Sequence, residues 1–155
     1  MKLCFKNMDK KDLDKAAKLF QVAFQQAPWN ENWTYQQSFE RLSEIMSTHS
    51  SIGYVIYDNE LLIGMLLGRV LPYLDDYELI IEEVCIAQGY QGQNLGSRLL
   101  DYTKQQCLQK NITHISLNTI RGFLSDVFYQ KNGFYEKTDI VCMGCQLEGN
   151  NNGNC

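Results

Sequence analysis

The chain has 155 residues, a net charge of −4 and ordinary fractions of apolar and charged side chains, which together suit one globular domain. The negative charge argues against nucleic acid as a partner, and no apolar run approaches the roughly 20 residues of a membrane span. The first ten residues lack the apolar core and cleavage site of a signal peptide, so we expect a cytoplasmic protein that binds neither nucleic acid nor membrane, and we leave a homodimer open.

The first 50 residues predict one strand and two helices. The strand covers residues 2–7, and Asp9 can cap a helix whose apolar side chains recur every three or four residues. Pro28 ends that pattern, because the residue before a proline is pushed out of the helical region. Thr34 and Gln37 form the polar pair of a capping box and predict the start of the second helix.

The rest of the chain alternates strands and helices. Residues 61–71 are apolar at consecutive positions, which predicts a strand covered on both faces. The patterns predict, in order, strands over 51–57, 61–71 and 77–86, a helix over 95–111, a strand over 114–118, a short helix over 124–133, and closing strands over 134–137 and 140–147. The expected order is β-α-α-β-β-β-α-β-α-β-β, which is one mixed α/β domain over residues 1–147. The polar tail, residues 148–155, has almost nothing to bury and is expected to be disordered.

The cysteines and histidines do not suggest a metal site. The cysteines that lie in apolar or amphipathic stretches are interpreted as buried free thiols: Cys4, Cys85, Cys107 and Cys142. Cys142 and Cys145 match C-x-x-C, but they fall in a predicted strand and no second Cys or His pair follows at ligand spacing. His49 and His114 are isolated in the sequence. We expect no metal.

A loop with two glycines joins the strand over 77–86 to the helix that follows. Its sequence, YQGQNLG, lies at a helix start, where unpaired backbone N–H groups and the helix dipole favour a phosphate. The loop lacks the Gly-Lys-Ser/Thr of a P-loop and does not meet the dinucleotide fingerprint G-x-G-x-x-G. Glycines also occur in ordinary turns, so the loop alone is a weak signal.

Residues 82–100, EEVCIAQGYQGQNLGSRLL, resemble the acyl-CoA-binding motif of the GNAT family of N-acetyltransferases, and residues 127–134, VFYQKNGF, resemble the family's closing helix and strand. The resemblance implies a mixed, mostly antiparallel central sheet flanked by helices, and acetyl-CoA as cosubstrate. It also implies that backbone groups of Val84, Cys85 and Ile86 pair with the pantetheine arm. The pyrophosphate would be bound by Gln91, Gly92, Gln93, Asn94, Leu95 and Gly96. Asn94 stands where the family has glycine, and asparagine is the other residue that best tolerates a positive φ.

The resemblance assigns the general acid to Tyr129, which would protonate the leaving thiolate; without it, Tyr129 would be interpreted as a packing residue. Glu82 and Glu83 are candidate bases, and strand alternation cannot choose between them, although the family pattern favours Glu83. A bulge in the strand would change which face each carboxylate occupies. Many family members have an asparagine seven residues before the tyrosine, and here that position is Gly122.

The acceptor is the largest unknown. Between Arg69 and Arg98 all charged residues are acidic, which is either a solvated surface or a cleft that attracts a cation. Trp29 and Trp33 either pack around the second helix or wall an acceptor pocket. The resemblance implies acetyl transfer to a primary amine of a small cationic molecule, such as an aminoglycoside, a polyamine or an amino-acid derivative. A protein N-terminus or lysine as acceptor, and a non-catalytic acyl-CoA-binding module, are the alternatives.

Overall fold

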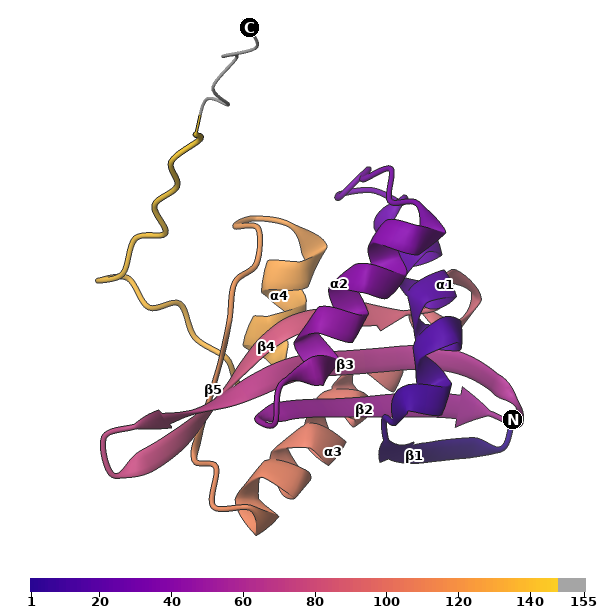
Figure 1. Cartoon of the computed structure of the whole chain (residues 1–155). Coiled ribbons are helices and arrows are strands. Elements are labelled where there is room, and N and C mark those ends of the chain that lie inside the picture. Colours follow the sequence, from indigo (N-terminus) through magenta and orange to yellow (C-terminus); the bar gives the residue numbers. More distant parts are fainter. Residues whose placement is uncertain (148–155) are drawn as a thin grey trace, which may run out of the picture.

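Five strands form one sheet in the order β1-β2-β3-β4-β5 (Figure 1). The structure is a computed structural model that describes residues 1–147, and the polar tail expected over 148–155 lies outside the described residues. The strands are β1 (Leu3–Asn7), β2 (Ser51–Asp58), β3 (Leu61–Tyr73), β4 (Asp76–Ile86) and β5 (His114–Leu117). The first three pairings are antiparallel, and β4 pairs with β5 in parallel. The expected mixed, mostly antiparallel sheet is confirmed.

Helices cover both faces of this sheet. The α-helices are α1 (Leu13–Phe24), α2 (Tyr35–Ser47), α3 (Leu95–Gln109) and α4 (Leu124–Lys131), and short 3-10 helices occupy Lys10–Asp12 and Gln88–Tyr90. Figure 1 shows α1 and α2 together over the near face, with α3 behind the sheet. The start of α2 is fixed as expected, because Thr34 and Gln37 form both hydrogen bonds of a capping box.

The two faces of the sheet carry two separate apolar clusters. On the α1 and α2 side, Phe20 and Leu42 pack against Met65 and Leu67 of β3. On the other side, residues of α3 and α4 pack against Ile63 and Leu66 of β3, together with residues from the neighbouring strands. Residues 62–68 of β3 are all buried, so the prediction that this strand is covered on both faces is confirmed.

The two closing strands expected over residues 134–137 and 140–147 are wrong. The segment forms neither helix nor strand, and its large apolar side chains are exposed, including Ile140, Val141 and Met143. An alternating apolar pattern stabilises a strand only when a neighbouring strand supplies backbone partners and a face to bury. In the described residues, β5 has a paired strand only on its β4 side.

The interpretation of the cysteines is half right. Cys85 and Cys107 are buried free thiols as expected, whereas Cys4 and Cys142 are exposed. Cys142 and Cys145 also lie outside any strand, because the segment that carries them has no partner.

Candidate active site

The sheet opens beside the second half of β4. The parallel pairing with β5 covers only Glu78–Ile81, whereas the pairing with β3 continues to Ile86. Residues 82–86 therefore have one edge without a partner strand in the described chain. An unpaired strand edge presents free backbone N–H and C=O groups, to which an extended ligand can bind as an added strand does. Val84, Cys85 and Ile86 lie on this segment, where the family resemblance placed the pantetheine arm, and the Ile86 carbonyl accepts a hydrogen bond from the Gln91 side chain.

A β-bulge at Glu82 decides which way the two glutamates face. Leu67 is opposite Glu83 and the next residue, Gly68, is opposite Ile81, so Glu82 is the extra residue on β4. Ile81 packs in the cluster on the α3 side, while Cys85 packs on the α1 and α2 side. Simple alternation would put Ile81, Glu83 and Cys85 on one face, and the bulge reverses the pattern after Ile81.

Gly68 permits the close approach at this bulge. A Cβ atom added to it would lie 2.4 Å from the backbone oxygen of Ile80, a contact that real Cβ atoms do not make. Only glycine allows the backbones of β3 and β4 to come so near each other. The identity of residue 68 is therefore linked to the orientation of Glu83, which lies on the neighbouring strand.

Glu83 is a buried carboxylate with one cationic partner. Its side chain is 5% exposed, and its Oε1 atom accepts a hydrogen bond of 2.5 Å from Nε of Arg41 on α2. Burial raises the pKa of Glu83, Arg41 opposes that rise, and the charges of Glu82 and Glu31 add to it. A raised pKa brings a carboxylate closer to the range in which it can accept and release a proton near neutral pH.

Glu82 lies in a different setting. It pairs with Arg69 of β3, and its side chain is 24% exposed, so it is more open to solvent than Glu83. Each of the two glutamates therefore forms an ion pair with an arginine, and these arginines partly neutralise the acidic stretch between Arg69 and Arg98.

Tyr129 of α4 lies near both Glu83 and Cys85. Burial, with a smaller contribution from the charge of Glu83, raises the pKa of Tyr129 to about 12. The ring packs edge-on against Phe128 and Phe134. A phenol with this pKa is protonated throughout the neutral range, which is the state that a proton donor needs. Burial also raises the pKa of the Cys85 thiol, so this cysteine is a neutral packing residue and not a nucleophile.

The loop before α3 has the backbone conformation that its glycine and asparagine suggested. Gly92 has φ of +74° and Asn94, which caps α3, has φ of +61°. No atom lies within 4 Å of a Cβ added at Gly92, so the backbone there is open to a ligand. No backbone N–H from Asn94 to Ser97 donates a hydrogen bond within residues 1–147, and no side chain caps the helix. Such a group of free donors at a helix start is a suitable binding site for an anion.

The side chains of the loop have structural roles. Nε2 of Gln91 donates to the Ile86 carbonyl at 3.1 Å, and Nε2 of Gln93 donates to the Gly89 carbonyl at 3.1 Å. Leu95 is buried in the core, so only its backbone is available to a ligand. A Cβ atom at Gly96 would lie 3.0 Å from the ring of Phe128, so this glycine lets α4 pack closely against the start of α3.

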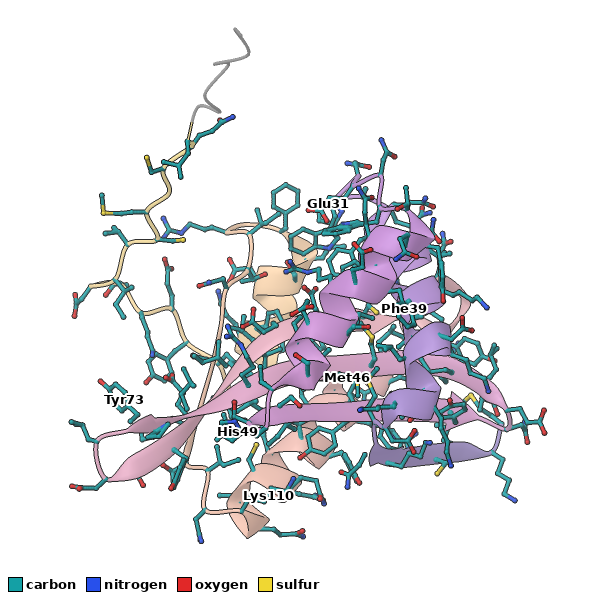
Figure 2. The ribbon with its side chains drawn as sticks, in the orientation of Figure 1. Glu31, Phe39, Met46, His49, Tyr73 and Lys110 are labelled. Carbon is teal, nitrogen blue, oxygen red and sulfur yellow. The ribbon has the colours of Figure 1, made fainter. Side chains whose placement is uncertain are left out.

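The two tryptophans lie in different surroundings. Nε1 of Trp33 donates to Glu31 at 2.6 Å, its ring packs on Phe20, and the guanidinium of Arg41 lies 5.5 Å from its ring centre. Trp33 is thus part of the surroundings of Glu83, whereas Trp29 packs on Phe24. Figure 2 shows Glu31 at the end of the loop that leads into α2.

Sequence reasoning missed Arg41 and Glu31. Arg41 lies 42 residues before Glu83, on the polar side of a helical pattern, and no local signal links the two.

Two shallow hollows lie elsewhere, one lined in part by His49 and Lys110 and one by Lys6 and Tyr57, and neither includes Glu83 or Tyr129. Within residues 1–147, no three His, Cys, Asp or Glu side chains gather as a metal site would require. No helix in this part of the chain is both long and apolar enough to cross a membrane.

The open β4 edge suits an extended ligand, the free N–H groups at the start of α3 suit a phosphate, and Tyr129 lies near the buried Glu83. The model of the Acetyltransferase (GNAT) family matches residues 14–134. The chain belongs to the GNAT family of acetyltransferases.

Solved structures share the fold over nearly the whole chain. A possible acetyltransferase from Clostridium difficile 630 is 14% identical with a TM-score of 0.81, and the match covers 95% of this chain and 99% of that one. The aminoglycoside acetyltransferase meta-AAC0020, from an uncultured soil metagenomic sample and in complex with sisomicin, is 17% identical with a TM-score of 0.77, covering 94% and 97%. Glucosamine-6-phosphate N-acetyltransferase from Arabidopsis thaliana is 17% identical with a TM-score of 0.68, covering 96% and 100%. A comparison with curated protein sequences finds no significant match.

Proposed function

We propose that this chain transfers the acetyl group of acetyl-CoA to the primary amine of a small cationic acceptor, by direct attack while both substrates are bound. The observation that carries the proposal is the position of Glu83, a buried carboxylate on the unpaired segment of β4, with Tyr129 close enough for the charge of Glu83 to raise the pKa of the phenol. The proposal takes residues 1–147 as the catalytic domain. It includes a cytoplasmic location, which suits the five free thiols of the described cysteines.

The backbone of the loop and of β4 would bind the cosubstrate. The free N–H groups from Asn94 to Ser97, together with the open backbone at Gly92, would bind the pyrophosphate. The unpaired edge at Val84, Cys85 and Ile86 would pair with the pantetheine arm. The side chains of Gln91 and Gln93 keep the loop in shape and leave the phosphate to the backbone.

Glu83 and Tyr129 would handle the two protons of the reaction. The amine nitrogen forms the new C–N bond, the C–S bond breaks, and its electron pair goes to sulfur. Glu83 takes the proton from the attacking nitrogen, and Tyr129 gives its hydroxyl proton to the thiolate. Because the charge of Glu83 helps to raise the pKa of Tyr129, protonation of Glu83 lowers that pKa and makes the phenol a better donor. The two steps therefore assist each other.

The charges around Glu83 support a cationic acceptor. Glu31 lies close enough to Glu83 for its charge to raise the pKa of Glu83, and Arg41 is the cation bonded to Glu83, so acidic groups outnumber the one bonded cation there. Trp33, which contacts this group, would form one wall of the acceptor pocket, and Trp29 would lie farther out along the same loop. Glu82 would affect binding through its pair with Arg69. A surface with net negative charge attracts cationic molecules such as aminoglycosides, polyamines and basic amino-acid derivatives.

Two measurements test the proposal. Saturating acetyl-CoA should raise the melting temperature, because a ligand that binds only the folded state stabilises it. Release of coenzyme A, followed across a panel of aminoglycosides, polyamines, amino acids and lysine peptides, should be fastest with a small cationic amine. Turnover with lysine peptides or protein N-termini alone would refute the small acceptor. Binding without turnover of any amine would fit the non-catalytic acyl-CoA module instead.

A further inference from the structure

We infer that Arg41 is a positioning residue for the base: its Nε–H holds Oε1 of Glu83 on the α2 side of the sheet and leaves Oε2 to take the proton from the amine. This inference rests on the proposed function of Glu83. It adds a residue from outside the two motifs that identify the family, since Arg41 lies on α2, far from both in the sequence.

The geometry of the contact supports a positioning role. Nε of Arg41 is the only one of its nitrogens that bonds to a carboxylate in residues 1–147, and Oε2 of Glu83 has no hydrogen-bond partner there. A structural Arg–carboxylate pair commonly uses two parallel hydrogen bonds, which would occupy both oxygens. Here one oxygen is held and the other is left for another donor. The ring of Trp33, 5.5 Å from the guanidinium, restricts where Arg41 can move.

Because the Glu83 carboxylate is buried, it needs the positive charge of Arg41 to stay ionised. Glu83 is 5% exposed, and an unpaired carboxylate in such a place favours its neutral form. Arg41 is the only cation in contact with it in the described residues; the other charged or titratable groups that face it are Glu82 on β4, Glu31 on the loop before α2, Cys85 on β4 and Tyr129 on α4. The two glutamates oppose the ionised form of Glu83, and the thiol and the phenol are neutral. Without Arg41, Glu83 would therefore be protonated over a wider range of pH and could not accept a proton there.

The pair of Arg69 and Glu82 supplies a matched control. Arg69 and Arg41 are almost equally exposed, at 44% and 43%, and each bonds to one of two successive glutamates of β4. Glu82 is the bulged residue and is more exposed than Glu83, so its arginine has less effect on the state of the base.

The test measures kcat/KM against pH for Arg41→Gln, for Arg69→Gln and for the parent enzyme, with the same amine throughout. At each pH, the kcat/KM of the variant is divided by that of the parent, so that the titration of the amine itself cancels from this ratio. A contacting cation typically changes a carboxyl pKa by about one unit or more, which is about tenfold in the ionised fraction. The ratio for Arg41→Gln should fall about tenfold from the alkaline to the acid end of the profile. The ratio for Arg69→Gln should not depend on pH. Arg41→Lys, which keeps a cation, should restore most of the parent profile.

Three outcomes would overturn the inference. The first is a ratio for Arg41→Gln that does not depend on pH, and the second is an equal pH dependence for Arg69→Gln. The third is a loss of activity of Arg41→Gln that is the same at every pH and is accompanied by a lower melting temperature, which would indicate a structural role only. If Arg41→Gln does not fold, Arg41→Met replaces it, because its side chain can still pack on Trp33. A carbon-13 NMR titration of the Glu83 carboxyl group in the same variants tests the effect of Arg41 without any turnover. If no amine is acetylated, the proposed function fails, and an unchanged Glu83 titration in Arg41→Gln separately refutes the inference.

Discussion

Gly92→Val tests the loop that we propose holds the pyrophosphate. Gly92 has φ of +74°, a region in which residues with a Cβ atom are strained. A Cβ atom there would touch nothing within 4 Å, so the substitution changes the backbone and causes no clash. Valine, whose branched side chain is poorest in this region, would shift the loop toward negative φ and turn the free N–H groups at the start of α3 away from a common centre.

The expected loss follows from that strain. Holding a residue other than glycine in the left-handed region costs roughly 1–2 kcal/mol, and each 1.4 kcal/mol is about tenfold in a dissociation constant. If binding must restore the parent loop, coenzyme A should bind roughly 5- to 30-fold more weakly. The melting temperature should change little if the loop relaxes in the free protein.

Calorimetric titration with coenzyme A measures this loss, and the same loop supplies the control. Gly89 has equally open surroundings but is not among the residues with positive φ, so Gly89→Val should leave the dissociation constant within about twofold of the parent. Asn94→Gly, which relieves a milder strain at φ of +61°, should bind at least as well as the parent. If the folded Gly92→Val protein binds coenzyme A like the parent, the loop does not hold the phosphate and this part of the mechanism is wrong.

Three further predictions concern the proton donor, the bulge and the acceptor. Tyr129→Phe should lower kcat on the order of 100-fold with unchanged affinity for acetyl-CoA, while phenylalanine at the exposed Tyr135 should have no effect; equal kcat for the Tyr129 variant in steady-state assays would remove this residue from the mechanism. Gly68→Ala, whose Cβ would meet the Ile80 backbone, should lower stability in urea titrations by about 1–3 kcal/mol and reduce activity. Gly64→Ala, whose Cβ would have isoleucine side-chain atoms and no backbone atom as its nearest neighbours, should cost less, and the reverse order would contradict the close approach at the bulge. Added salt should lower kcat/KM for a cationic amine by about threefold or more, and a preference for neutral or anionic amines would refute the electrostatic part of the proposal.

The sequence predicted the elements whose signals are local. The capping pair Thr34 and Gln37, the helical stripes and the strand patterns before residue 119 each depend on residues a few positions apart, and the structure confirms them. The conformations of Gly92 and Asn94 were also predictable, since few residues adopt a positive φ. The mixed, mostly antiparallel sheet followed from the resemblance to a family and is confirmed by the strand pairing.

The features that depend on distant pairing were not predictable. The bulge at Glu82 arises from the register between β3 and β4, and it reverses the alternation from which the face of Glu83 would be inferred. The contact of Arg41 with Glu83 joins a helix to a strand across 42 positions. The closing strands over 134–137 and 140–147 were expected from composition, but a strand requires a neighbour, which no local pattern specifies.

The most direct test of the site is the rate of acetyl-amine formation by Glu83→Gln compared with Glu82→Gln. Both variants keep the size of the side chain and remove one charge from neighbouring positions of β4, so they differ mainly in the face that the bulge gives each residue. With the best amine of the panel, Glu83→Gln should lose roughly 100-fold or more in kcat/KM, because it removes the base, while Glu82→Gln should stay within a few fold of the parent. Equal rates for the two variants, or a larger loss for Glu82→Gln, would contradict the assignment of Glu83 as the base.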